Sequence, residues 1–133
     1  MRQLVTATLV VYWTMLCIGT HLPSRFVAAP LLVSDKVLHF LGYTGLSFLL
    51  ATLLPLLGVG ERRVYWGALL VAIVYGAVDE LGQIPVPGRT AELGDWFANV
   101  AGAVVGVTCY RLTTVAVGDQ VFRLWPEKKP SPP

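Results

Sequence analysis

Four long apolar runs, with charged residues gathered at their ends, constrain this 133-residue chain more than any other feature. Each run approaches the roughly 20 residues that an α-helix needs to cross a hydrocarbon core about 30 Å thick. The sequence is 55% hydrophobic and only 14% charged, whereas an ordinary soluble domain carries about 25% charged residues. We therefore predict an all-α integral membrane protein, a compact bundle of four transmembrane helices at residues 4–20, 35–57, 64–84 and 90–115.

The first run has a second interpretation, as a secretory signal peptide. Arg2 precedes its apolar centre, and Val27, Ala28 and Ala29 weakly resemble a cleavage site. However, Pro30 would follow the cut, and the run is longer than the apolar region of most signal peptides. We expect a retained helix.

The length allows one domain, which we place at residues 1–117, followed by a cytoplasmic tail at residues 118–133. The tail is rich in proline and lysine, so we expect it to be disordered or to rest on the membrane surface. Cys17 and Cys109 lie within apolar runs without metal-binding spacing, and we expect no disulfide between them. A net charge of +2 with no basic block before the tail gives no indication of nucleic-acid binding.

The distribution of Lys and Arg predicts the orientation in the membrane. With four spans, both termini and the 58–63 loop share one side. The basic residues on that side are Arg2, Arg62, Arg63, Arg111, Arg123, Lys128 and Lys129. The other side holds only Arg25, Lys36 and Arg89. Because positive charge is retained in the cytoplasm, we expect both termini there and the remaining loops outside.

Polar residues recur on single faces of the expected helices. At about 100° per residue, Asp35, His39 and Gly42 share one narrow stripe of the second helix with Leu46, and Tyr43 lies at its edge. A carboxylate and an imidazole are therefore stacked on one face, with glycine beneath them.

The third helix repeats this pattern in reverse. Glu80 and Gln83 lie on one side, above small residues spaced by four, and Asp79 lies farther round. The small residues are Ala68, Ala72 and Gly76. Such spacing lets membrane helices approach closely, either within one chain or in a homodimer.

The fourth helix places Asp95, Asn99, Gly102 and Gly106 within about 60° of one another. Its other directions are more compatible with lipid and carry Trp96, Phe97, Val100, Val104 and Val107. Before this helix, Pro87 and Gly88 predict the centre of a type II turn that returns Arg89 toward the helix ends.

Ionisable side chains near bilayer depth cost roughly 2.5 to 3.5 kcal/mol each, so they indicate a functional site. We expect an extracytoplasmic ligand-binding site formed by Asp35, Lys36, His39, Tyr43, Glu80, Gln83, Arg89, Asp95 and Asn99.

The ordered set Asp35-Lys36-x-x-His39-Phe40-x-x-Tyr43, Glu80-x-x-Gln83, Pro87-Gly88-Arg89 and Asp95-x-x-x-Asn99-x-x-Gly102 resembles the VanZ-like membrane proteins. The resemblance covers residues 34–106 and implies a bacterial multi-pass membrane protein. The founding member of that family is linked to low-level resistance to the glycopeptide antibiotic teicoplanin. The resemblance implies no settled biochemical mechanism.

Three functions fit the polar cluster. As a binding site, Arg89, Lys36 and protonated His39 would pair with phosphate, diphosphate or carboxylate on a lipid-linked envelope precursor, phospholipid headgroup or glycopeptide. The carboxylates and Asn99 would accept hydrogen bonds from sugar hydroxyls or peptide amides. Several carboxylates in one cluster argue against a purely anionic ligand.

As a membrane enzyme acting on a lipid-linked phosphoester, the chain would use Asp35, His39, Glu80 and Asp95 as acid, base and orienting groups. No HExxH or DDxxD motif is present, and His21 is expected in a loop without a partner. We expect neither a metal nor a cofactor, although the same groups could hold a divalent ion in the enzyme hypothesis. The third hypothesis is a structural cluster that only locks the helices together.

Overall fold

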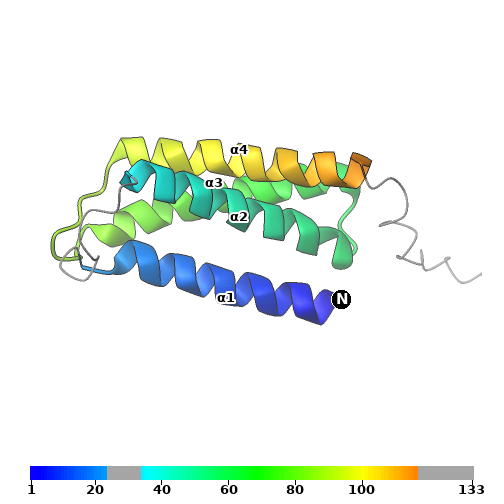
Figure 1. Ribbon diagram of the computed structural model, residues 1–133, viewed down its shortest axis with the longest axis horizontal. Coiled ribbons are helices and arrows are strands. Elements are labelled where there is room, and N and C mark those ends of the chain that lie inside the picture. The colour runs from blue at the N-terminus through cyan, green and yellow to red at the C-terminus, as the bar shows by residue number, and fades with distance from the viewer. Residues whose placement is uncertain (24–33, 117–133) are drawn as a thin grey trace, which may run out of the picture.

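The computed structural model describes residues 1–23 and 34–116, and these form four helices that run alternately up and down (Figure 1). They are α1 (Arg2–His21), α2 (Asp35–Leu56), α3 (Glu61–Gln83) and α4 (Leu93–Ala116). The described residues contain no strand. The cleavage-like segment at 27–29, the basic residue Arg25 and the predicted tail at 118–133 lie outside the described residues.

The predicted fold class is confirmed. Three helices, α1, α2 and α3, are long and apolar enough to cross a membrane by themselves. The fourth, α4, has 24 residues and would extend about 36 Å at 1.5 Å per residue. Glycine and polar residues line the face of α4 that packs against α2 and α3.

The closest packing in the bundle joins α2 to α4. A methyl group on Gly102 would overlap the backbone carbonyl of Phe40, and one on Gly106 would overlap the carbonyl of Thr44. The buried Ser47 hydroxyl uses this proximity to donate a hydrogen bond of 2.9 Å to the carbonyl oxygen of Ala103. Small residues therefore let two membrane helices approach to backbone contact, as the spacing on α4 predicts.

The small residues of α3 also lie inside the bundle. Ala68, Ala72 and Gly76 are buried, and Gly76 faces the side chains of Asn99 and Tyr43. The predicted inward faces of α3 and α4 are thus correct. Homodimer formation through such faces stays a prediction.

Two expectations about lipid-facing residues have different outcomes. Val107 is only 8% exposed, so its placement toward lipid was wrong. It follows Gly106 and belongs to the buried apolar core of the bundle. Cys17 and Cys109 are exposed on the bundle surface and form no disulfide.

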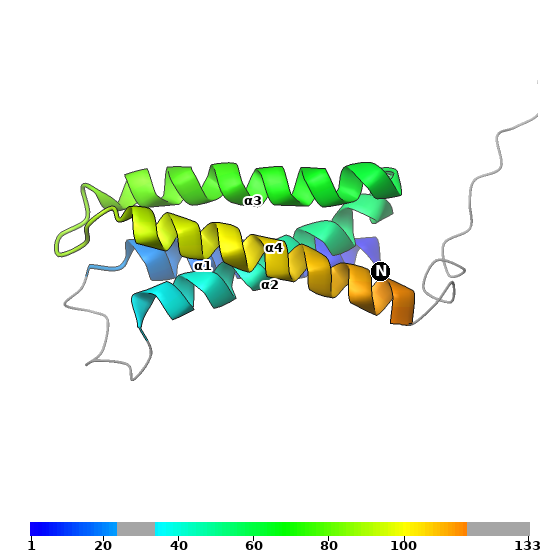
Figure 2. The same ribbon diagram turned by 90° about the horizontal axis from the view of Figure 1, so that it is seen from above.

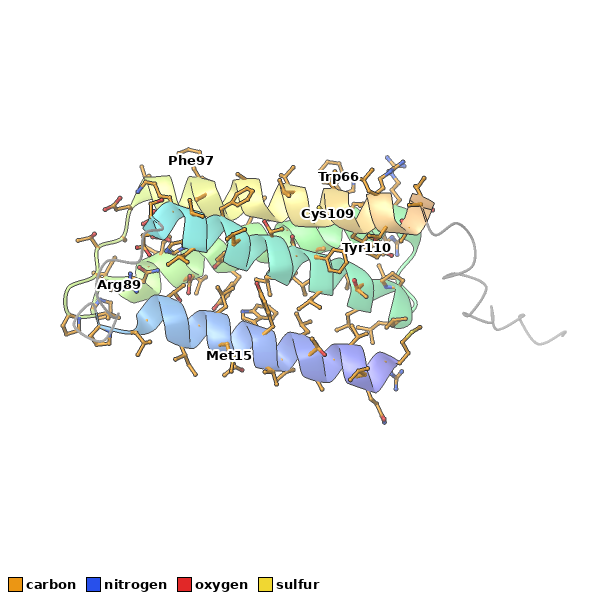
Figure 3. All side chains as sticks on the ribbon, viewed as in Figure 1. Met15, Trp66, Arg89, Phe97, Cys109 and Tyr110 are labelled. Atoms are coloured by element: carbon orange, nitrogen blue, oxygen red, sulfur yellow. The ribbon has the colours of Figure 1, made fainter. Side chains whose placement is uncertain are left out.

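The first helix lies at the edge of the bundle, against α2 and α3 (Figures 1 and 2). Only Leu9 and Thr20 of this helix are buried, and Met15 points away from the other helices (Figure 3). Polar contacts supplement this limited packing, since the Tyr12 hydroxyl donates a hydrogen bond of 2.9 Å to the carbonyl oxygen of Gly42.

The connection between α3 and α4 contains the predicted type II turn. The Arg89 amide donates a hydrogen bond of 3.0 Å to the Val86 carbonyl, and Gly88 at the third position has a φ of 78°. This left-handed conformation favours glycine. The turn places Arg89 at the end of the bundle where α2 and α4 begin and α3 ends (Figure 3).

Candidate functional site

The alternating directions of the helices bring most of the candidate residues to one end of the bundle. The first turns of α2 and α4 carry Asp35 and Asp95. The last turn of α3 carries Glu80 and Gln83. Because α3 runs opposite to α2 and α4, these turns lie side by side, and the 84–92 connection closes over them.

A buried hydrogen-bonded network links three helices below this end. The Nδ1 atom of His39 lies 3.0 Å from Oδ1 of Asn99 and 3.6 Å from Oε1 of Glu80. The Asn99 amide nitrogen donates a hydrogen bond of 3.5 Å to Oε1 of Glu80. Both neighbours of Nδ1 are acceptors, so Nδ1 carries the hydrogen and Nε2 keeps its lone pair in the neutral ring. All three residues are at most 5% exposed.

Charged residues at the exposed end of the bundle surround the network. The Lys36 ammonium lies 2.9 Å from Oε2 of Glu92 and 3.1 Å from Oδ1 of Asp95. The hydrogen bond from Lys36 and its positive charge lower the pKa of the Glu92 carboxyl. The backbone amide of Glu92 in turn donates a hydrogen bond of 3.3 Å to Oε2 of Glu80. The connection before α4 is therefore attached both to the exposed lysine and to the buried network.

Arg89 links the remaining elements. Its guanidinium donates to Oδ2 of Asp35 at 3.2 Å, to the Leu22 carbonyl at 3.1 Å and to the Gly19 carbonyl at 3.3 Å. These carbonyls belong to the end of α1, where the last carbonyl groups have no hydrogen-bond partner within the helix itself. Arg89 therefore joins α1 to the first residue of α2.

Tyr43 and Gln83 do not join this network, although both are almost completely buried. The Tyr43 ring stacks on Tyr75 with centroids 5.9 Å apart. Among the described residues, neither the Tyr43 hydroxyl nor the Gln83 amide nitrogen has a hydrogen-bond partner. Tyr75 also contacts Trp13 of α1, with ring centroids 5.0 Å apart, so Tyr43 lies on the side of the bundle interior that α1 covers.

A second polar contact lies on that side and was not predicted. The Thr20 hydroxyl donates a hydrogen bond of 2.8 Å to Oδ1 of Asp79, whose side chain is buried. His21 Nδ1 lies 3.6 Å from the same oxygen. The expectation that His21 lies in a loop without a partner was wrong, since it is the last residue of α1. The contact between His21 and Asp79 depends on α1 packing beside this part of α3. Helical periodicity in the sequence does not show which helices are neighbours.

Three groups are placed where they could share a metal ion. One ligand atom each from Asp35, His39 and Asp95 lie within 4.8 Å of one another. His39 and Asp95 are buried and Asp35 is exposed. Imidazole and carboxylate are ligands of zinc and of other divalent transition metals. The expectation of no metal and no cofactor stays a prediction.

The comparisons with known proteins agree with the resemblance seen in the motifs. A family model described as VanZ/LLP1 matches residues 4–114. The chain belongs to the VanZ-like family. The match includes α1, so it extends well beyond the residues 34–106 that carry the motifs. No curated protein and no solved structure matches the chain.

The polar end of this VanZ-like protein contains more carboxylates than basic groups. Among the described residues at this end, the carboxylates belong to Asp35, Asp79, Glu80, Glu92 and Asp95, and the permanent cations to Lys36 and Arg89. Both cations already contact carboxylates. The site therefore offers hydrogen-bond acceptors and negative charge more readily than free basic groups.

Proposed function

We propose that this VanZ-like membrane protein binds the polar head group of a cell-envelope ligand at the end of the bundle formed by the first turns of α2 and α4. One observation carries the proposal: a buried polar floor lies directly beneath an exposed charged rim. His39, Glu80 and Asn99 form the floor, each at most 5% exposed. The side chains of Lys36 and Asp35 on the rim are 53% and 48% exposed.

The chemistry of the site favours a ligand with both donors and acceptors. Sugar hydroxyls and peptide amides would donate hydrogen bonds to Glu80, Glu92 or Asp95. A phosphate or carboxylate on the same ligand would compete for Lys36 and Arg89, which an anion can draw from their present partners. Lipid-linked envelope precursors, phospholipid headgroups and glycopeptides such as teicoplanin combine these groups.

The site lies on the extracytoplasmic side of a bacterial inner membrane in this proposal. Arg2, Arg62, Arg63 and Arg111 all belong to the opposite end of the bundle, where α1 and α3 begin and α4 ends. At the polar end, both described basic residues, Lys36 and Arg89, form ion pairs with carboxylates. The positive-inside rule then supports cytoplasmic termini.

Native mass spectrometry of the full chain, purified in mild detergent from a bacterial membrane, tests the proposal. We expect an adduct with the mass of an envelope lipid or precursor, reduced at least tenfold by Arg89→Ala. The matched control is Arg63→Ala, because Arg63 is exposed at the other end of the bundle. Equal adducts in both variants would show binding away from the polar end, and a folded wild type without any adduct would contradict the proposal.

A membrane enzyme is the second candidate, and the proximity of Asp35, His39 and Asp95 favours it. Such a site would act on a lipid-linked phosphoester, with Glu80 beside His39 as a further acid or base. Glu80→Gln should then abolish turnover of the lipid-linked substrate while the chain keeps its thermal stability. Glu61→Gln, an exposed glutamate at the opposite end, is the control.

A further inference from the structure

We propose that Asp35, His39 and Asp95 bind one zinc ion, and that the ion presents an open coordination position to a phosphate or carboxylate of the head group. This inference rests on the proposed function, because it names the group through which the polar end would recognise an anionic ligand. It explains how a site rich in carboxylates can recognise an anion.

The positions of the three ligand atoms support the site. Zinc binds histidine nitrogen and carboxylate oxygen at about 2.0 to 2.2 Å, so tetrahedral ligand atoms lie roughly 3.4 Å apart. The three atoms here lie within 4.8 Å of one another. Asp35, with its side chain 48% exposed, can rotate to close this difference, while His39 and Asp95 are held by burial. Three protein ligands leave a fourth position open, as in catalytic zinc sites.

The surroundings of His39 favour metal binding through its other ring nitrogen. Nδ1 contacts Oδ1 of Asn99 at 3.0 Å and lies 3.6 Å from Oε1 of Glu80. Zinc-binding histidines commonly donate their second ring N–H to such an acceptor, which fixes the tautomer and the ring orientation. Nε2 is then the unprotonated nitrogen that a metal requires.

The two carboxylates are also prepared for an ion. Asp35 and Asp95 lie in the first turns of α2 and α4. Arg89 contacts Oδ2 of Asp35 and Lys36 contacts Oδ1 of Asp95. The second oxygen of each carboxylate remains for a metal.

Zinc titration of the full chain, without an affinity tag and after chelator treatment in detergent, tests the inference. We expect about one zinc per chain by calorimetry and elemental analysis. His39→Gln and Asp95→Asn should each lower the affinity at least a hundredfold. The matched controls are His21→Gln and Asp79→Asn, which remove the same groups outside the proposed site and should keep the stoichiometry.

Two further variants extend the test, and the first keeps it decisive if a buried substitution prevents folding. Asp35→Asn changes an exposed side chain and should fold while losing zinc. Asn99→Ala removes the partner of His39 and should weaken zinc binding by roughly 10- to 100-fold. Equal zinc binding in wild type, His39→Gln and Asp35→Asn would mean an adventitious ion only, and absence of binding in folded wild type would also overturn the inference.

The metal site and the head-group site can fail separately. If the envelope adduct in native mass spectra persists in chelator and no zinc binds, the head-group proposal stands and the zinc site is wrong. If one zinc binds through His39 while no adduct forms under any condition, the zinc site stands and the proposed ligand is wrong.

Discussion

The Nδ1 atom of His39 lies 3.0 Å from the Oδ1 atom of Asn99, and this contact joins α2 to α4 inside the polar end of the bundle. Asn99 has no exposed surface, and its amide nitrogen reaches Glu80 on α3. One amide side chain therefore satisfies polar groups from two other helices. Since burial makes unpaired polar groups costly, the stability of the bundle should be sensitive to this residue.

We expect Asn99→Ala to lower the free energy of unfolding by about 1 to 3 kcal/mol, because His39 and Glu80 would stay buried without their partner. This exceeds the ~0.6 kcal/mol average for polar contacts between membrane helices, where partners can often be replaced. Thermal unfolding in one detergent measures the change. Thr108→Ala, which removes an exposed hydroxyl of the same helix, is the control and should change stability by less than about 0.5 kcal/mol. Unchanged stability in Asn99→Ala would indicate that the network is retained for a ligand rather than for locking the helices.

The contact between α2 and α4 gives a second prediction. Gly102→Ala should cost about 1 to 3 kcal/mol, because the added methyl group meets the rigid backbone of Phe40 rather than a movable side chain. Gly19→Ala on α1 is the control, since nothing lies within 4 Å of its added methyl group. That change should be neutral or should stabilise the helix by up to about 1 kcal/mol. Equal effects of the two substitutions would contradict the close helix packing.

The sequence predicted the helices and their inward faces because both follow from local periodicity. Small residues on α3 and α4 indicated close packing without knowledge of the neighbouring helix. The boundaries were less accurate where a polar first turn begins the helix, as at Glu61 in α3. In α3, hydropathy places the start at the first apolar residue, Val64, whereas the helix begins at Glu61.

The partners of the polar residues were harder to predict, since they depend on the arrangement of whole helices. Glu92 received no role from the sequence, yet it contacts Lys36 and Glu80. Asp79 and Glu80 lie on different sides of α3. The side chain of Asp79 is buried because α1 packs on its side. In the sequence, Thr20 and His21 stand out as polar residues at the end of an apolar run. This pattern alone does not identify Asp79 as their partner.

The ion pair between Lys36 and Glu92 predicts a pH dependence of stability. The pKa of Glu92 is lowered from its ordinary value of 4.5, first by the hydrogen bond from Lys36 and then by its charge. A lowered pKa in the folded state adds stability above the ordinary pKa, and this stability is lost as the pH falls through the lowered value. Glu92→Gln should therefore reduce the melting temperature at pH 7 and have no effect once Glu92 is protonated. In a Lys36→Met background the same substitution should have no effect at either pH, and a persistent effect would assign the stabilisation to another partner.

Cysteine labelling measures the predicted orientation. Cys17 and Cys109 would be replaced by alanine, and a single cysteine would be introduced at Thr90 or at Gly60, which are exposed at opposite ends of the bundle. A membrane-impermeant maleimide should label the Thr90→Cys chain in intact cells. The Gly60→Cys chain should react only after permeabilisation. The reverse pattern would place the polar end in the cytoplasm.

The hydrogen bond from Thr20 to Asp79 predicts how α1 is held in the bundle. Thr20→Val keeps the side-chain shape but removes the hydroxyl that donates to Asp79 at 2.8 Å. We expect a loss of about 1 to 3 kcal/mol, because Asp79 stays buried without that donor. Asp79→Asn in the Thr20→Val background should recover part of the loss, since a neutral amide costs less than a carboxyl group to bury without that donor. Thermal unfolding in one detergent measures both changes against Thr14→Val, whose exposed hydroxyl donates only to Val10 of its own helix. Equal melting temperatures for the Thr20 and Thr14 variants would show that apolar contacts alone hold α1 in place.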